Sequence, residues 1–363
     1  IFYMKIPTPK FGLNRHDTSS VNGYATDVAR AEAFGWDAAF LPDSQLRRRD
    51  TYVLLYAAAI ATQEIVLGTL LTNPVTRHPS VTASSISTVA EYAKARTILA
   101  CGIGDTAVRL SGLRPAKISE LRDSTILLKS LLTGDPVEIA SGRPSVLPFR
   151  QDVPVWLAAG GPRTLEMAGG CADGVFIRVG TNIENIRIAV SNINMGAQKS
   201  GRDSDSIKLG AVFHTVFVEE EEKAITMGKS IAAGYYEYSP MLLKNLNMPW
   251  MGPHPDLLKE SEGIWPDFHH HTNLEESGRV VDFLAPEHAR SFALIGNAKS
   301  ISTQLFEIIL EASVLGIQFE YIVLQPIPNP PTPDPGPDSY LERVPKEIIS
   351  VVKKSLESAN LGL

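Results

Sequence analysis

The sequence has little cysteine, no long apolar run and no excess of positive charge. Its 363 residues include two cysteines, Cys101 and Cys171, each inside an apolar segment, which favours two reduced core thiols over a disulfide or a redox pair. No run of about 18 apolar residues is present, so we expect no membrane span. The formal net charge of −6 argues against nucleic acid as the main partner, because nucleic-acid-binding proteins usually carry a basic face.

The sequence also shows no secretion signal, no flexible linker and none of the common catalytic motifs. Residues 1–9 lack the apolar run of a secretion signal, and no flexible Gly/Ser run divides the middle of the chain. We therefore expect a cytoplasmic protein with a single domain over residues 1–363. No zinc-type ligand spacing, Walker loop or GxSxG elbow occurs, and we expect no metal site.

Short apolar runs alternate with longer amphipathic ones, which is the pattern of repeated βα units. Strands that are almost entirely apolar suit a parallel sheet buried on both faces. A doubly wound sheet has the same alternation, but eight units and the absence of an early glycine fingerprint favour a closed (β/α)8 TIM barrel. The predicted strands are Phe11–Asn14, Ala38–Leu41, Ile65–Leu71, Thr97–Cys101, Val155–Ala159, Val175–Arg178, Leu209–Val218 and Ile317–Leu324.

Three segments do not follow the βα alternation. A Pro/Gly-marked excursion covers Gly134–Pro148. Residues 235–290, rich in Pro, Trp, Met and His, are predicted to be an insertion before the last unit and to form a lid over the barrel mouth, where loops vary between enzymes. Residues 326–363 are predicted to be a C-terminal extension, with an extended stretch at Pro326–Pro337 and a helix at Lys346–Ser358.

Polar residues and glycines follow the predicted strands at their carboxyl ends, where (β/α)8 enzymes carry their active-site groups. His16 follows the first strand and is a candidate general acid/base or substrate contact. The other strand ends read Pro42–Gln45, Leu70–Pro74, Gly102–Asp105, Ala158–Pro162 and Arg178–Thr181.

Ala159-Gly160-Gly161-Pro162, at the start of a helix, is the strongest single signal. Two glycines let the backbone approach a ligand closely, and proline suits the first helical turn. Free amides and the helix dipole there favour a phosphate or similar anion, although an ordinary tight turn has the same residues. Arg178, at the next strand end, can face the same anion or pair with a surface carboxylate.

The run His269-His270-His271 resembles a metal-binding tract. Three adjacent residues cannot easily all face one ion, so we expect a solvated or lid segment instead. His78 precedes Pro79, and we expect it to cap the following helix.

Several stretches together resemble the bacterial luciferase-like superfamily of flavin- and deazaflavin-dependent oxidoreductases. Within it, the chain is most similar to the methylenetetrahydromethanopterin reductase-like branch, which also contains deazaflavin-dependent glucose-6-phosphate dehydrogenases. The stretches that carry the resemblance are Ala29–Trp36, Leu67–Pro74 with Arg77 and Pro79, Gly102–Asp105, Ala158–Pro162, Ala168-Gly169 and Ala172–Gly174.

The resemblance implies a (β/α)8 barrel with an insertion before its last unit, a homodimer and a cofactor site. It places a non-proline cis peptide bond at Leu70-Leu71, behind the isoalloxazine ring. It assigns Asp105 as an acid beside the substrate. The remaining cofactor contacts that it implies are Thr72, Asn73 and Gly104 around the ring and Ala159, Gly160, Gly161, Arg178 and Val179 at the phosphate.

One departure from the family pattern concerns the reaction. Deazaflavin-dependent members usually carry an Asp-His pair after the second strand, with the histidine close to the reacting carbon, whereas this sequence has Asp43-Ser44. Serine is not an acid/base near neutral pH unaided, so either His16 takes over or the reaction differs. Asp43 and Ser44 are nevertheless candidate catalytic residues.

The departure leads to three functional hypotheses. The first is a two-component monooxygenase that uses O2 and reduced FMN, supplied by a separate flavin reductase, on a small organic substrate in a pocket from which water is excluded. The second is a coenzyme F420 (deazaflavin)-dependent reductase or dehydrogenase that transfers a hydride. The third is a flavin-binding protein without catalysis. The missing histidine favours the first, and the close likeness to the deazaflavin-dependent branch favours the second; we place the first ahead.

Overall fold

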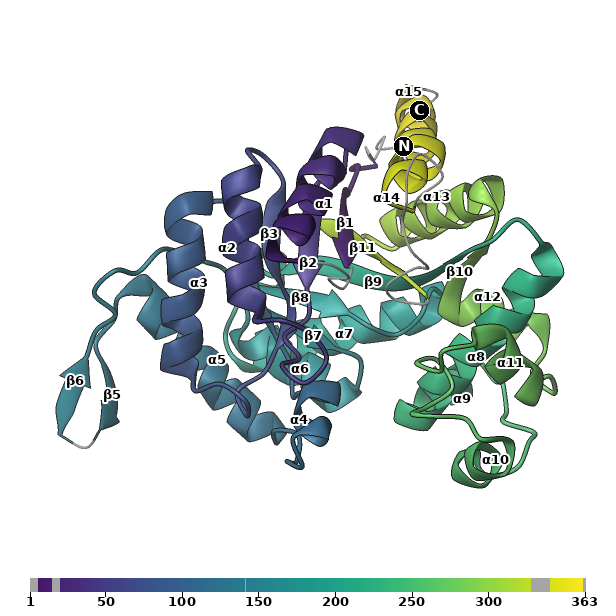
Figure 1. The fold of residues 1–363 in the computed structure, drawn as a ribbon, viewed down its shortest axis with the longest axis horizontal. Helices are drawn as coiled ribbons and strands as arrows, with labels where there is room; N and C mark the ends of the chain where they lie inside the picture. Colours follow the sequence, from purple (N-terminus) through teal and green to yellow (C-terminus); the bar gives the residue numbers. More distant parts are fainter. Residues whose placement is uncertain (1–5, 15–19, 141, 328–339, 362–363) are drawn as a thin grey trace. The chain divides into compact units, whose positions relative to one another are not determined.

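The chain has the (β/α)8 barrel fold that the sequence predicts (Figure 1). The computed structural model describes residues 6–14, 20–140, 142–327 and 340–361. Among these, the strand order of the main sheet is β10-β9-β11-β1-β2-β3-β4-β7-β8, with a further pairing of β9 and β8. The pairing with β8 closes eight strands into a ring, and β10 is added beside β9.

In the main sheet, the predicted strands agree with the observed ones to within a few residues, with one omission. Ala293–Gly296 forms an additional strand, β10, which pairs in parallel with residues 214–217. It directly follows a helix, so its four apolar residues resemble the end of that helix in sequence. The strands are β1 Lys10–Asn14, β2 Ala38–Leu41, β3 Val66–Thr72, β4 Thr97–Cys101, β7 Val155–Ala159, β8 Gly174–Ile177, β9 Lys208–Phe217, β10 and β11 Tyr321–Pro326.

Local capping signals define several helix ends. Oγ of Ser20 accepts a 3.0 Å hydrogen bond from the Gly23 amide at the start of α1, and Gly35 ends α1 with a φ of 99°. Nδ1 of His78 accepts from the Ser80 amide, which confirms its role as a helix cap. The helices of the barrel are α1 Val21–Phe34, α2 Thr51–Ala61, α3 Pro79–Ala93, α4 Thr106–Leu110, α5 Ile118–Thr133, α6 Pro162–Cys171, α7 Ile183–Lys199, α8 Glu221–Tyr238 and α13 Ala298–Val314.

The chain divides into two compact units. The first comprises residues 1–11, 178–191 and 211–363, and the second comprises residues 12–177 and 192–210. The single-domain assignment and the position of the insertion as a lid stay predictions.

The second unit is built on β2, β3, β4, β7 and β8, with α1, α2 and α3 side by side along it (Figure 1). Its core contains the rings of Phe40, Trp156 and Phe176, with centroids 5.3 Å apart for Phe40 and Phe176 and 4.6 Å apart for Trp156 and Phe176. The predicted excursion after α5 is an antiparallel hairpin of β5 Val137–Ala140 and β6 Arg143–Ser145, which projects outward in Figure 1.

Glu32 of α1 binds the segment between α2 and β3. Its carboxylate accepts hydrogen bonds from the backbone amides of Gln63, Glu64 and Ile65 at 3.1, 2.8 and 2.7 Å. Burial raises the pKa of Glu32, but these amides and the charge of Arg96 outweigh burial, so the pKa is lowered overall.

We expect Glu32→Gln to lower the free energy of unfolding by about 1 kcal/mol at pH 7. A carboxyl group whose pKa is lowered in the folded state stabilises the fold above its unfolded pKa, which is about 4.3. That contribution is lost as the pH falls through the folded pKa. Urea unfolding of both proteins from pH 7 to pH 3 should therefore show the difference narrowing below about pH 4; a constant difference would contradict the ionic origin of the effect.

The first unit contains the predicted insertion, which lies between β9 and β10. The insertion is helical, with α9 Met241–Asn245, α10 Pro255–Glu262, α11 Leu274–Val280 and α12 Pro286–Phe292. Ile231 of α8 packs with Leu274 and Ala289 in a buried core. Trp250 stacks on Tyr236 with ring centroids 4.4 Å apart and planes 7° apart.

The C-terminal part of the first unit is also helical. Residues 328–339, which include most of the predicted extended stretch, lie outside the described residues. The predicted helix Lys346–Ser358 is longer in the structure, with α14 Tyr340–Arg343, a π-helical turn over Val344–Ile349 and α15 Ser350–Leu361. Pro345 has no N–H for the regular helical bond, which explains the wider turn.

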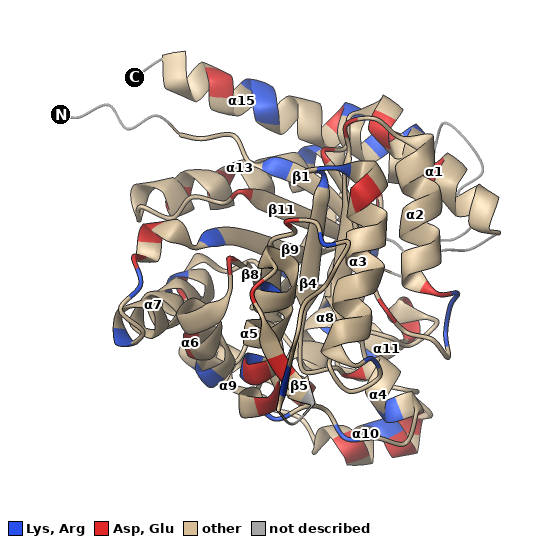
Figure 2. Cartoon of the chain, turned by 90° about the vertical axis from the view of Figure 1, so that its left-hand side faces the viewer, with Lys and Arg blue, Asp and Glu red and all other residues tan. Residues whose placement is uncertain are grey.

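Cys101 and Cys171 are free thiols, and burial raises the pKa of Cys101 to about 12 and that of Cys171 to about 11. No helix in the described ranges is long and apolar enough to cross a membrane. Acidic and basic residues are interspersed on the elements facing the viewer in Figure 2.

Candidate active site

The end of β3 carries the backbone feature that the family resemblance implies. The peptide bond between Leu70 and Leu71 is cis, and the pairing of β3 with β4 shifts register between Thr69 and Thr72. Gly102, at the end of β4, makes room for this bulge, because a Cβ there would lie 2.9 Å from a methyl carbon of Leu71.

Asp43 is the centre of a buried ionic network beside this bulge. Its side chain is 3% exposed, and its carboxylate accepts hydrogen bonds from Oγ1 of Thr72 at 2.8 Å and from Nε of Arg77 at 2.9 Å. Arg77 also donates to Asp50 at 2.6 Å, and its guanidinium lies 4.9 Å from the centroid of the Tyr52 ring. The network joins the loops after β2 and β3 to the start of α2.

The pKa shifts in this network follow from the sharing of one guanidinium by two carboxylates. Burial lowers the pKa of Arg77, but the hydrogen bonds and charges of Asp43 and Asp50 outweigh burial and raise it. Burial raises the pKa of Asp50, but Arg77 and the backbone amides at the start of α2 outweigh it and lower the pKa. Arg77 therefore stays charged and holds both carboxylates in position.

Ser44 is a buried polar residue next to Asp43. It is 5% exposed, and its hydroxyl has no hydrogen-bond partner among the described residues. Burying a hydroxyl without a partner is unfavourable. A bound ligand that hydrogen-bonds to Oγ would remove this cost.

Asn73 and Gly104 shape the loops around the cis bulge. Oδ1 of Asn73 accepts from the amides of Val75 and Thr76 at 3.0 and 2.9 Å, so this oxygen already has partners within its own turn. Gly104 has a φ of 81°, and a Cβ there would crowd Val108 and Asn73. These two residues determine the backbone conformation of the loops. Their contacts with the cofactor ring remain predictions.

Asp105 occupies the N-cap position of α4 and forms an ion pair with Arg109, with Oδ1 and Nε 2.5 Å apart. Its side chain is 43% exposed. Asp105 is thus an accessible carboxylate with a local cation, and its role as a catalytic acid stays a prediction.

The Ala159-Gly160-Gly161 turn leaves the start of α6 open. Pro162 is the first residue of α6, Gly161 is the cap residue, and no side chain caps the helix. A Cβ at Gly161 would meet no atom within 4 Å. A helix start without a side-chain cap is the arrangement that can bind a phosphate through its backbone amides.

Arg178 and Val179 belong to the first unit, at the end of β8. Val179 is buried. Arg178 forms no hydrogen bond or ion pair with a described residue, so the predicted pairing with a surface carboxylate is absent there. Burial, followed by the charge of Arg178, lowers the pKa of His214 on β9 well below its usual value. An unpaired guanidinium of this kind is available to an anion.

For three residues, His16, Arg77 and Asp50, the sequence alone did not establish a position or role in the site. His16 lies outside the described residues. Arg77 was noticed only as part of the family pattern, and Asp50 was missed. The signal for Asp50 was its position before Thr51-Tyr52, as the cap of an apolar helix.

Comparison with known proteins gives the family. The sequence profile of the luciferase-like monooxygenase family matches residues 8–313. The chain belongs to this family. The superfamily expected from the sequence is thereby confirmed, and the chain is an oxidoreductase by family.

Relatives within the luciferase-like family include two reductases and one solved structure. The chain is 30% identical over 239 residues to the 5,10-methylenetetrahydromethanopterin reductase of Methanolobus tindarius, covering 63% of this chain and 72% of that protein. It is 27% identical to the same reductase of Methanopyrus kandleri, covering 95% and 99%. The structure of the coenzyme F420-dependent tetrahydromethanopterin reductase from Methanopyrus kandleri superposes with a TM-score of 0.69 at 23% identity, covering 95% and 99%.

Proposed function

We propose that this protein is a coenzyme F420-dependent reductase or dehydrogenase that exchanges a hydride with a small organic substrate. The observation that carries the proposal is the full-length similarity to methylenetetrahydromethanopterin reductases, the branch expected from the sequence. It reverses the order of the two hypotheses in the sequence analysis, where FMN and a monooxygenase came first.

The residues of the second unit fit a flavin-type cofactor. The family resemblance places a flat ring against the cis bulge at Leu70-Leu71, and Gly102 leaves space for that bulge. The open start of α6 at Gly161 offers amides to a phosphate. When bound, the deazaflavin supplies a hydride-carrying carbon.

The polar residues beside the cis bulge have different chemical capacities. Asp43 acts as a positioning residue, because its carboxylate is held by hydrogen bonds from Arg77 and Thr72. The hydroxyl of Ser44 has no partner among the described residues and is the group free to hydrogen-bond to a polar atom of the cofactor or substrate. Asp105 and His16 remain the proposed candidates for proton transfer.

A two-component FMN monooxygenase is the second candidate, and Ser44 is the observation that favours it. A hydroxyl does not supply the acid/base group that the deazaflavin-dependent relatives carry at this position. The monooxygenase would require a separate flavin reductase as a partner. We propose a homodimer for either function, on the basis of the family resemblance alone.

Cofactor titration distinguishes the two candidates. We expect coenzyme F420 to bind at micromolar concentration, followed by its absorbance and fluorescence, and FMN to bind at least 10-fold more weakly. Gly161→Ala is the matched variant: with open space at Cβ and a φ of −81°, it should change the free energy of unfolding by less than about 0.5 kcal/mol. Its methyl group would stand before the amides of α6 and should weaken cofactor binding about 10-fold, or roughly 1.4 kcal/mol.

Two results would contradict this proposal. Micromolar binding of FMN without binding of F420 would replace the F420 function with the monooxygenase. Unchanged binding by Gly161→Ala would remove the turn from the cofactor site.

A further inference from the structure

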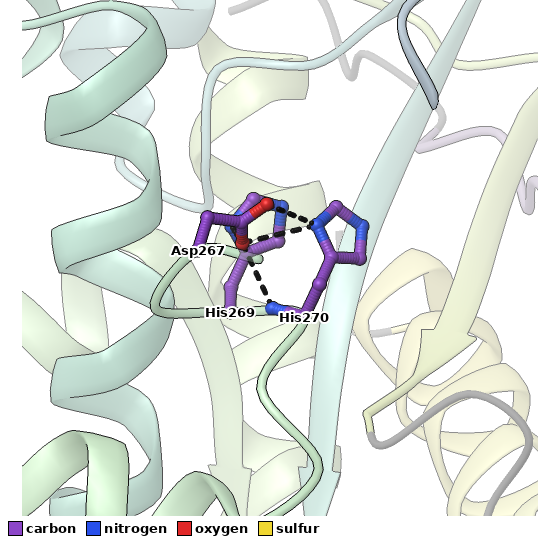
Figure 3. A group of neighbouring side chains, drawn as sticks. All are labelled: Asp267, His269 and His270. Atoms are coloured by element: carbon purple, nitrogen blue, oxygen red, sulfur yellow. Dashed lines mark hydrogen bonds and ion pairs between the residues drawn. The ribbon is translucent and has the colours of Figure 1, made fainter. Parts of the chain in front are cut away.

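Three side chains of the insertion form a compact group of nitrogen and oxygen donors (Figure 3). Nδ1 of His270 lies 2.8 Å from Oδ2 of Asp267, and Nδ1 of His269 lies 3.0 Å from Oδ1 of Asp267. One potential ligand atom from each residue lies within 4.8 Å of the others. His271 does not take part, because its ring turns to the backbone of Trp265.

The spacing of these atoms is that of a metal site. In a tetrahedral site with bonds of about 2.0–2.1 Å, neighbouring ligand atoms are about 3.3 Å apart. The two carboxylate–imidazole distances are slightly shorter than this value, so a small outward movement of the partly exposed His270 ring would admit an ion. Two imidazoles and one carboxylate are a frequent ligand set for first-row transition ions.

His214 of β9 provides an independent observation beside the group. It is 3% exposed, and neither of its ring nitrogens has a hydrogen-bond partner among the described residues. Its ring centroid lies 5.7 Å from that of His269. A buried imidazole with two unused nitrogens is costly without a ligand, and the ring of His214 packs beside that of His269.

The surrounding residues hold the group in place. The carbonyl of Phe268 accepts hydrogen bonds from Ser230 and Ser277 at 2.5 and 2.7 Å, and its ring is fully buried. Tyr238 donates to Oδ2 of Asp267 at 2.9 Å. These contacts fix the backbone between the donors, as metal sites require of the residues around their ligands.

Gly234 of α8 is required by the position of His269. A Cβ at Gly234 would overlap Nδ1 and Cγ of the His269 ring. The helix therefore has a glycine, which is unfavourable in a helix interior, at the position where the imidazole lies against it. The absence of a side chain at Gly234 thus leaves the space that the His269 ring occupies.

We propose that Asp267, His269 and His270, with the unpartnered imidazole of His214 packed beside them, bind one divalent first-row transition ion of the Zn2+ class. The proposal goes beyond the F420-dependent function and does not depend on it. It also replaces the sequence-based expectation of no metal site. That expectation considered three adjacent histidines, whereas the group uses two of them and the aspartate upstream.

The nitrogen and oxygen ligands determine which ions can compete for this site. Imidazole suits Zn2+, Co2+, Ni2+ and Cu2+, whereas Mg2+ and Ca2+ take oxygen ligands. The site should therefore bind Co2+ in the presence of a large excess of Mg2+. Ligating nitrogens must be unprotonated, so the measurement belongs near neutral pH or above.

The test is a titration of chelator-treated, cofactor-free protein with Co2+, followed by the visible absorption of the bound ion. We expect one equivalent to bind, Zn2+ to displace it, and Mg2+ to have no effect. His270→Gln and Asp267→Asn should each weaken Co2+ binding by at least about 100-fold. His270 is 30% exposed at its side chain, so its substitution should leave the fold intact, which circular dichroism can verify.

Two other histidines of the insertion are matched controls. His271→Gln changes the same tract at a ring that faces away, and His254→Gln changes an exposed histidine whose Nδ1 lies 3.8 Å from Asp256. Both should bind Co2+ as the unchanged protein does. No Co2+ absorption with the unchanged protein, or equal loss in His271→Gln and His270→Gln, would overturn the proposal and leave a hydrogen-bonded Asp–His group.

Discussion

Arg77→Met is expected to lower the free energy of unfolding by about 3 kcal/mol, because it leaves the buried carboxylate of Asp43 without its cation. Arg77 is 19% exposed and Asp43 is 3% exposed at their side chains, so water can replace little of the lost interaction. Methionine keeps much of the apolar stem. Urea unfolding at pH 7 measures the change.

The exposed ion pair of α4 gives the control for this prediction. Arg109 is 62% exposed and pairs with Asp105 four residues earlier, so Arg109→Met should cost less than about 1 kcal/mol. In the double variant Asp43→Asn/Arg77→Met the loss should be smaller than the sum of the single losses, because the stranded charge is gone. Equal losses for Arg77→Met and Arg109→Met would show that the Asp43 network does not depend on burial.

Gly169→Ala should be destabilising by at least about 2 kcal/mol, because overpacking of a tight interface cannot relax when the obstacle is backbone. A Cβ at Gly169 of α6 would overlap the carbonyl of Ile193 on α7, and a Cβ at Gly196 of α7 would overlap the carbonyl of Glu166 on α6. The two helices thus approach each other through reciprocal glycines. Urea unfolding measures the loss of stability. Since Gly161 caps the start of α6, displacement of this helix should also weaken cofactor binding.

The neighbouring glycine in the same helix is a matched control. At Gly170 an added Cβ would meet mainly Oγ of Ser200, which is the end of a side chain that can rotate away. Gly170→Ala should therefore be neutral, or stabilising by up to about 1 kcal/mol through helix propensity. Similar losses at both positions would mean that the helix, and not the interhelical contact, requires glycine.

The barrel could be predicted from the sequence because its strands are short apolar runs. The helices between them begin and end at capping residues, such as Ser20 and Gly35, that can be recognised from the local sequence. β10 could not be predicted in this way. Its four residues are recognisable as a strand only by their pairing with residues 214–217 of β9, and such pairing depends on contacts far apart in the sequence. The helices of the insertion were also not predicted individually, because α9, α11 and α12 have five to seven residues, too few for a clear period.

The candidate site was predictable where backbone conformation is tied to residue type. The glycine turn before Pro162 was predicted from its residues, whereas the position of the cis bulge was implied only by the family resemblance. The pairing of side chains was not predictable, because Arg77 reaches Asp43 and Asp50 across 34 and 27 residues. The same holds for His214, which lies beside His269 only in the folded chain.

The distribution of the four tryptophans makes the two units separately observable by fluorescence. Trp36 and Trp156 are 3% and 2% exposed and belong to the second unit, whereas Trp250 and Trp265 belong to the first, and Trp265 is 77% exposed. Buried indoles emit at shorter wavelengths than solvated ones, so replacing either pair with phenylalanine gives a protein whose emission reports one unit. Coincident denaturant transitions of the two proteins would define a single cooperative fold, and separate transitions would define two foldons.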